Sequence, residues 1–427
     1  MYIVKLAEEV TRFRGGKMRT TTKLFVLILA LILLVVPVFG GCAKNETVQG
    51  KSVTVGMLQT SLIFGGALYD GFIDYVQYFN QQGGADGVKV KVVMHDTLMS
   101  PAEGAKGFRI CEDAGAVLIA CPMVTDAKGA APLANQAKLP LLCSIASEAM
   151  LYPPAYAWNI APTAGQDIGT FLHWVAEKDW DWEGKGRPPK ILVWHFESGT
   201  QEDYVNIGEP IAKSLGLTWL DPEIYPFPFP MDWTPYMLRL REKNPDYVYG
   251  VIYELLTAAH DTGLAVPQGT KLCYFYGQTY VLAGDFGEKA IGCLSMQRWA
   301  NIEDTNVPGI ILMKELLAKN RRSSELNYVN YYNWGFVLGI AACELIQTAV
   351  QDAGYPVTKD AVVSALGKFD SNLMGMVGRV SFTPESRQGN TAVRILAVDE
   401  NLKSVPLTDW IPTVPLEETL RALGMID

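Results

Sequence analysis

The chain has 427 residues, of which 49% are apolar and 19% are charged. That balance is typical of a folded globular protein and excludes a disordered chain or a polytopic membrane protein, and the length predicts two domains. Asp and Glu outnumber Lys and Arg by 45 to 36, and the formal net charge of −9 argues against a nucleic-acid partner.

The N-terminal segment has the organisation of a secretory signal. Basic residues precede an almost unbroken apolar run at 24–39, which is shorter than the roughly 20 residues of a membrane span. The run ends in two glycines and Cys42, which resembles the lipobox of bacterial lipoproteins. We therefore expect a lipidated Cys42 in preference to plain cleavage of the signal. A further alternative, an uncleaved anchor, leaves the protein in the same compartment. Met18 is the expected initiator, because a signal does not need the mixed-charge stretch before it.

A polar tether at 43–51 leads into a first series of alternating strands and helices. Short apolar runs predict the strands, and apolar residues at helical spacing predict the helices between them. The strands are expected at 52–58, 88–94, 116–120 and 139–143, and the helices at 69–80, 101–112 and 126–137. Alternation at this spacing predicts a parallel sheet covered by helices.

A second, comparable series follows and predicts a second α/β lobe. Its helices are expected at 171–178, 203–214, 233–243 and 255–263, and its strands at 190–196, 217–224, 246–253, 271–277 and 292–300. Later helices at 306–319, 331–352 and 358–368, and strands at 378–382 and 392–398, must complete one lobe or the other.

Six cysteines besides Cys42 have no zinc-site spacing: Cys111, Cys121, Cys143, Cys273, Cys293 and Cys343. Cys121 and Cys143 each end a predicted strand, so a disulfide is possible if those strands are neighbours. Their apolar surroundings favour the alternative, buried free thiols.

Three long patterns resemble the type I periplasmic solute-binding proteins of branched-chain amino acid ABC transporters, the leucine/isoleucine/valine-binding class. They are the opening strand and helix with NQQGG and GVKVKVVMHDT, the unit at 116–148, and MDWTPYMLRLREKNPDYVYG. The resemblance spans about residues 52–400. It implies two Rossmann-like lobes with parallel sheets, joined by a three-crossing hinge, which close on a small molecule like a Venus flytrap.

The resemblance also implies where the chain passes between the lobes. The crossings are expected near 160, 300 and 373. One lobe then holds 52–160 and 300–373, and the other holds 161–299 and 374–427.

Ligand-binding residues are expected beyond the carboxyl ends of the strands. Thr125 opens a helix after the third strand, and the fourth strand leads into Ser144, Ile145, Ala146 and Ser147. Helix N-termini and hydroxyl groups offer donors to a ligand carboxylate. The resemblance implies this role for Ser147 and for the amides of Ile145 and Ala146. The alternative is that Thr125 and Ser147 only cap helices.

Leucine-type members bind the ligand ammonium with an acidic residue after a second-lobe strand. Here strand 271–277 leads into Gln278, so the expected acid is missing. Glu254 and Glu197, which end two other strands, are the nearest substitutes, and exposed loop carboxylates are the alternative. This departure weakens the case for an α-amino acid and leaves amides and aromatic or other carboxylic acids as candidate ligands.

Several aromatic residues fall near predicted strand ends or helix starts and are candidates for enclosing an apolar ligand body: Tyr69, Tyr204 and Tyr253 foremost, then Tyr280, Trp299 and Tyr332. Tyr253 is the strongest of them because it ends a strand on the expected face. The alternative for each is a place in the core.

No enzymatic motif emerges. The sequence has no GxSxG elbow, no GxGxxG and no phosphate-binding loop, and His195-x-Glu197 lacks a third metal ligand at suitable spacing. We therefore expect no enzymatic activity, metal site or cofactor.

The predicted function is that of a monomeric substrate-binding component of an ABC importer. We expect it to be exported and either lipid-anchored at the outer face of the cytoplasmic membrane or periplasmic. Its partners would be a small-molecule ligand and the permease subunits. The alternative is a sensor of the same fold that signals through a membrane receptor.

Overall fold

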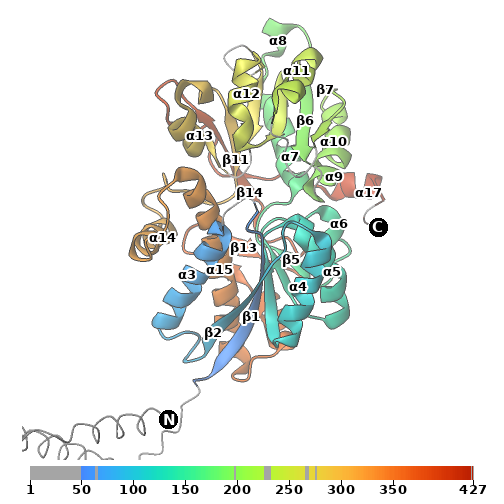
Figure 1. Cartoon of the computed structure of the whole chain (residues 1–427). Helices are drawn as coiled ribbons and strands as arrows, with labels where there is room; N and C mark the ends of the chain where they lie inside the picture. Colours follow the sequence, from blue (N-terminus) through green and yellow to red (C-terminus); the bar gives the residue numbers. More distant parts are fainter. Residues whose placement is uncertain are drawn as a thin grey trace, which may run out of the picture. The chain divides into compact units, whose positions relative to one another are not determined.

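The computed structural model describes residues 50–62, 66–196, 199–225, 232–264, 269–274, 277–424 and 426 (Figure 1). The signal segment, Cys42, most of the tether and Glu197 therefore lie outside the described residues.

The first lobe is built on a five-stranded, fully parallel sheet in the order β2-β1-β3-β4-β5. The strands are β1 (Ser52–Gln59), β2 (Lys89–Asp96), β3 (Ala116–Cys121), β4 (Leu141–Cys143) and β5 (Ala157–Asn159). The helices are α3 (Ala67–Gln81), α4 (Pro101–Asp113), α5 (Val124–Ala137), α6 (Glu148–Leu151), α14 (Pro308–Lys319), α15 (Leu326–Ala353) and α16 (Lys359–Leu366). A small hairpin of β12 (Asp370–Ser371) and β13 (Val380–Ser381) completes it.

Two cores cover the two faces of this sheet, because successive strand residues point to opposite sides. Val53, Val55 and Met57 pack with α3 and α15, whereas Leu58 packs with α4 and α5. Figure 1 shows the two pairs of helices on either side of β1 and β2. Because both faces of the sheet are buried, its strands are continuous apolar runs in the sequence.

The long helix α15 is the central helix of the first core. By length and composition it is the one helix among the described residues that could cross a membrane, but 83% of its most apolar window is buried within the protein. Its backbone lies directly against α3, and a Cβ added at Gly335 would lie 1.8 Å from the Leu68 carbonyl oxygen. The position of α15 in the core of the first lobe explains its apolar composition.

The second lobe is built on a nine-stranded sheet whose main path is β15-β14-β11-β10-β9-β6-β7, with β16 on β14 and β8 on β6. The parallel strands are β6 (Lys190–Phe196), β7 (Thr218–Trp219), β8 (Glu223–Tyr225), β9 (Tyr247–Val251), β10 (Lys271–Tyr274) and β11 (Leu294–Gln297). The antiparallel strands are β14 (Ala392–Val398), β15 (Ser404–Pro406) and β16 (Ile411–Pro412).

The helices of this lobe are α7 (Ala164–Trp174), α8 (Trp182–Lys185), α9 (Gly199–Asn206), α10 (Gly208–Ser214), α11 (Thr234–Lys243), α12 (Leu256–Asp261), α13 (Thr279–Phe286) and α17 (Glu417–Ala422). A π-helical turn at Val175–Asp179 extends α7, and 3-10 turns lie at Tyr253–Leu255 and Gly287–Ala290. The single helix predicted at 203–214 is two helices, because Pro210 lacks the N–H group that a continuous helix requires. α7 begins seven residues before the predicted start, at a capping box of Thr163 and Gln166.

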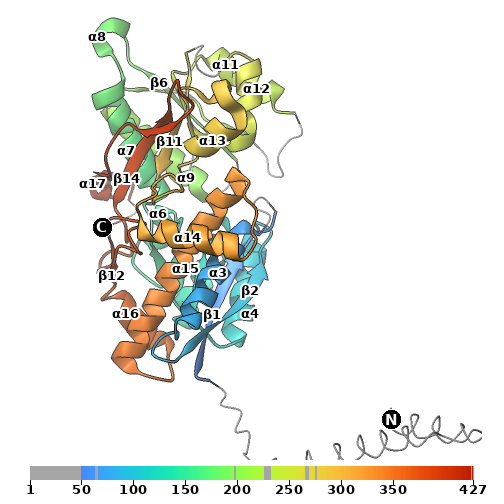
Figure 2. The ribbon, with the colours of Figure 1, turned by 90° about the vertical axis from the view of Figure 1, so that its left-hand side faces the viewer.

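The chain passes between the lobes after β5, after β11 and after β13. Leu373, Met376, Val380 and Phe382 pack in the first core, and the chain enters the second sheet only at β14. Figure 2 shows β12 beside α16 in the first lobe and β14 in the second. The third passage therefore follows Phe382 instead of lying near 373, because these apolar residues bury against the first lobe.

The six cysteines in the described part of the chain are buried free thiols. Cys121 and Cys143 are partners in the parallel ladder of β3 and β4, so the strands that they end are indeed neighbours.

Candidate ligand-binding site

The structure brings together the two first-lobe segments that were predicted to bind a carboxylate. Because β3 and β4 pair in register, the segment entering α5 and the loop 144–147 leave the same edge of the sheet. The Ser144 hydroxyl lies 3.5 Å from the Pro122 carbonyl oxygen, which joins the two segments directly.

Hydrogen-bond donors without acceptors gather at this edge. The hydroxyl groups of Thr125 and Ser147 are buried and have no hydrogen-bond partner among the described residues. α5 begins after Met123 without a side-chain cap, and Ser147 precedes α6 without capping it. Within the described residues, the amides of Ile145 and Ala146 donate no hydrogen bond to another backbone group. The capping alternative therefore explains neither hydroxyl, and buried donors without acceptors at a helix N-terminus suit an anionic ligand group.

Ser144 differs from Ser147 although both are fully buried in the same loop. Its hydroxyl accepts a hydrogen bond from the indole N–H of Trp334, on α15. The structure therefore gives Ser144 the role of attaching the loop to the first core.

In the second lobe, Gln278 is buried at the N-terminus of α13, the position where an acidic residue was expected. Its amide N–H donates to the Tyr331 hydroxyl at 3.2 Å, and the neighbouring Tyr280 hydroxyl donates to Asn330 Oδ1 at 3.2 Å. Both partners lie on α15, so these bonds join the lobes. The N-terminus of α13, after β10, thus carries an amide in place of the expected carboxylate.

Tyr253 and Glu254 follow β9 in the 3-10 turn. The Tyr253 ring lies 4.9 Å from the ring of Phe286, and its hydroxyl donates to Asp285 at 2.7 Å. The Glu254 side chain is exposed, yet desolvation raises the pKa of its carboxyl group.

The other two aromatic candidates pack differently. Tyr204 is fully buried in the second core, with ring centroids 5.2 Å from those of both His195 and Tyr249. Tyr69 is partly buried on α3 and packs against the first core. For Tyr204 the structure thus supports the core alternative.

Sequence reasoning missed a set of polar contacts between α5 or α6 of the first lobe and α9 of the second. Lys128 forms an ion pair with Glu202 at 2.7 Å, and the Glu148 amide donates to Asp203 Oδ2 at 2.9 Å. Glu148 also accepts a hydrogen bond from the Thr163 hydroxyl. No local pattern pairs residues that are far apart in the chain, so only the fold reveals these contacts.

The family profile of the periplasmic binding proteins matches residues 53–403 of this sequence. The chain belongs to the periplasmic binding protein family. A comparison with curated proteins returns no match. The profile match confirms the resemblance stated from the sequence patterns.

Solved structures of solute-binding proteins share the fold of this periplasmic binding protein. A branched-chain amino acid ABC transporter protein from Thermus thermophilus with bound valine is 20% identical, with a TM-score of 0.75 over 87% of this chain and 100% of that one. A Rhodopseudomonas palustris solute-binding protein in complex with 4-hydroxybenzoate is 18% identical, with a TM-score of 0.71 over 87% and 100%. Another from R. palustris BisB5, with 3,4-dihydroxybenzoic acid, is 16% identical, with a TM-score of 0.68 over 85% and 98%. The two α/β lobes of the type I fold are thereby confirmed.

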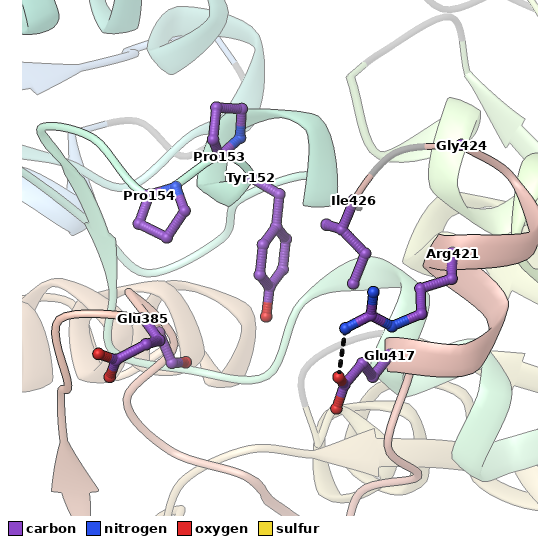
Figure 3. Close-up of a pocket in the computed structure, with 9 residues that line it drawn as sticks. Tyr152, Pro153, Pro154, Glu385, Glu417, Arg421, Gly424 and Ile426 are labelled. Carbon is purple, nitrogen blue, oxygen red and sulfur yellow. Dashed lines mark hydrogen bonds and ion pairs between the residues drawn. The ribbon is translucent and has the colours of Figure 1, made fainter.

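A cavity of about 680 Å³ lies elsewhere on this binding protein, between the loops after α6 and β13 and the C-terminal helix α17 (Figure 3). Its lining includes Tyr152, Glu385 and the Glu417–Arg421 ion pair, and none of the predicted ligand residues. No group of three or more His, Cys, Asp or Glu side chains in the described part of the chain could hold a metal ion.

Proposed function

We propose that this binding protein captures a small carboxylate between its lobes and delivers it to the permease of an ABC importer. The observation that carries the proposal is the pair of buried hydroxyl groups without partners, Thr125 and Ser147, at the carboxyl edge of the first sheet. A ligand carboxylate would accept hydrogen bonds from both, and charge-assisted bonds of this kind are the stronger ones.

The second lobe favours a ligand that does not depend on an ammonium group. The buried end of β10 offers the Gln278 amide, which already donates to Tyr331. A buried ammonium needs an anionic partner, and Glu254 is exposed instead of enclosed. Aromatic and aliphatic carboxylic acids therefore fit the described residues better than α-amino acids. The hydroxybenzoates bound by two of the solved structures belong to that chemical class.

Export and lipidation at Cys42 are part of the same proposal, since an importer needs its binding protein outside the cytoplasmic membrane. The apolar run and the two glycines before Cys42 support it. The mass of the mature N-terminus checks it: a diacylglyceryl-modified Cys42 is expected, and an unmodified N-terminus upstream of Cys42 would rule out the lipid anchor.

Calorimetry with valine, 4-hydroxybenzoate and 3,4-dihydroxybenzoate tests the ligand class. We expect the hydroxybenzoates to bind and valine to bind more weakly.

In the Ser147→Ala variant, loss of one hydrogen bond to a charged group should raise the dissociation constant roughly 10- to 100-fold. Ser214→Ala is the matched control, because Ser214 ends α10 at the opposite end of the second sheet from its carboxyl edge. Unchanged affinity in Ser147→Ala would refute the placement of the site.

A further inference from the structure

Two acidic residues from opposite lobes meet in the contact between α6 and α9. The backbone N–H of Glu148, the first residue of α6, donates to Asp203 Oδ2 of α9 at 2.9 Å. The Glu148 carboxylate accepts a hydrogen bond from the hydroxyl of Thr163, which caps α7. Each of these bonds joins a residue of the first lobe to a residue of the second.

Both carboxyl groups are withdrawn from water. Glu148 is 2% exposed and Asp203 is 4% exposed. A negative charge on either group loses its hydration, and the charge of Glu148 further disfavours ionisation of Asp203, so a proton on one of them is favoured. Burial raises the pKa of Glu148 to about 7. Burial and the nearby charge of Glu148 raise the pKa of Asp203 well above its ordinary value.

The charged groups around the pair do not neutralise it. Lys128 of α5 is the cation that faces it, and its ammonium group is engaged by Glu202 of α9 at 2.7 Å. The charge of Lys128 lowers the pKa of Asp203 less than burial and Glu148 raise it. The charges of Glu148 and of Glu417 on α17 both act on the hydroxyl of Tyr152, which follows α6. Arg421, which lines the same cavity as Tyr152, is itself paired with Glu417.

We propose that closure of the two lobes takes up a proton at the Glu148–Asp203 contact, which makes the proton a second ligand of the closed protein. When the lobes separate, α6 and α9 part, and water reaches both carboxyl groups. Their affinity for a proton then falls to that of ordinary exposed carboxylates. The structure described here, with the contact made, is the protonated form.

The direction of the pH effect follows from linkage. The closed form binds more protons than the open form, so a lower pH favours closure. This stabilisation is complete below the ordinary carboxyl pKa of the open form and is lost as the pH rises through the raised pKa of the closed form, about 7 for Glu148. Each proton changes the closure constant by up to roughly tenfold per pH unit. The matching change in ligand affinity rests on the proposed capture function, but the closure equilibrium itself does not.

The test measures closure without ligand. Nitroxide labels are attached at Lys106→Cys on α4 and Lys213→Cys on α10, whose native side chains are 60% and 66% exposed, in a chain with Cys42→Ser. Pulsed electron spin resonance then gives the fraction of molecules with the shorter distance between labels. We expect that fraction to increase as the pH is lowered from 8 to 5. In Asp203→Asn, which keeps an oxygen for the Glu148 amide but cannot ionise, the pH dependence should become shallower, because only Glu148 of the pair still takes up a proton.

Glu202→Gln is the matched control on the same helix. It removes an ion pair between the lobes but leaves the buried carboxyl pair, so it should lower the closed fraction at every pH and keep the pH slope. Distances that do not change with pH in the native protein, or an unaltered slope in Asp203→Asn, would overturn the proposal. If Asp203→Asn does not fold, Glu148→Gln takes its place. Because no ligand is used, this result is independent of the calorimetric screen.

Discussion

At the scale of single residues, the surroundings of a side chain decide its role more than its type does. Ser144 and Ser147 lie in one loop and are both buried, but the Trp334 indole donates to the Ser144 hydroxyl, whereas the Ser147 hydroxyl has no hydrogen-bond partner among the described residues. The sequence of residues 144–147 does not predict this difference, because Trp334, the partner of Ser144, lies far away in the chain on α15.

The buried His195 makes a prediction about pH and stability. Its ring is 3% exposed, and burial lowers its pKa to about 3. Below the ordinary pKa of about 6.5 the unfolded chain binds a proton that the folded chain excludes. This residue therefore lowers the free energy of unfolding by about 1.4 kcal/mol for each pH unit between about 6.5 and 3.

Urea unfolding of the native protein and of His195→Gln at pH 7, 6 and 5 isolates this contribution. Buried carboxyl groups such as Glu148 act in the opposite direction, so the difference between the two proteins is the informative quantity. We expect the native protein to lose more stability on acidification than the variant. Equal slopes for His195→Gln and the native protein would contradict the prediction.

At the scale of secondary-structure elements, the contact between α3 and α15 organises the first lobe. Gly71 and Gly335 let the two backbones touch, since an added Cβ would lie 2.0 Å from the Tyr332 carbonyl oxygen or 1.8 Å from that of Leu68. Backbone atoms cannot move aside as a flexible side chain can. This close packing explains why an apolar helix of 28 residues belongs to a core.

Gly335→Ala should therefore force α3 and α15 apart. We expect the free energy of unfolding to fall by about 2 kcal/mol or more, which lies within the usual range for overpacking. Gly367→Ala is the control, because an added Cβ there meets its nearest atom at 3.6 Å, an ordinary contact. Chemical denaturation of both variants measures the effect, and equal stabilities would show that the helices can shift without cost.

At the scale of the whole folded unit, hydrogen bonds hold the three passages between the lobes together. The Asn390 side chain donates to the Arg298 carbonyl oxygen, and the Gly389 amide donates to that of Asn159, so the third passage contacts the other two. Arg298 also pairs with Asp167 of α7, with 2.6 Å between Nε and Oδ2. Both side chains are almost completely buried, at 1% and 2% exposure.

Asp167→Ala tests this buried ion pair. The substitution leaves the Arg298 guanidinium buried without its anionic partner, and breaking such a pair typically costs about 3–5 kcal/mol of stability. Asp370→Ala removes an exposed partner of Arg379 and should change stability little. The urea concentration at the midpoint of unfolding compares the stabilities of the two variants. A loss in Asp167→Ala no larger than that in Asp370→Ala would show that other groups compensate Arg298.

The sequence by itself determined the two α/β lobes and the segments at the carboxyl edge of the first sheet. Strand and helix periodicity is local, and each βα unit can be recognised where it stands in the chain. For the same reason the sequence could place the segments of Thr125 and Ser147 at that edge, and the ligand-binding role of these residues stays a prediction. Only the tertiary structure decided that Tyr204 belongs to a core, that residues 373–382 stay with the first lobe, and that Glu148 meets Asp203. These outcomes depend on how separate units pack across a hinge, and no periodicity within a single segment encodes that packing.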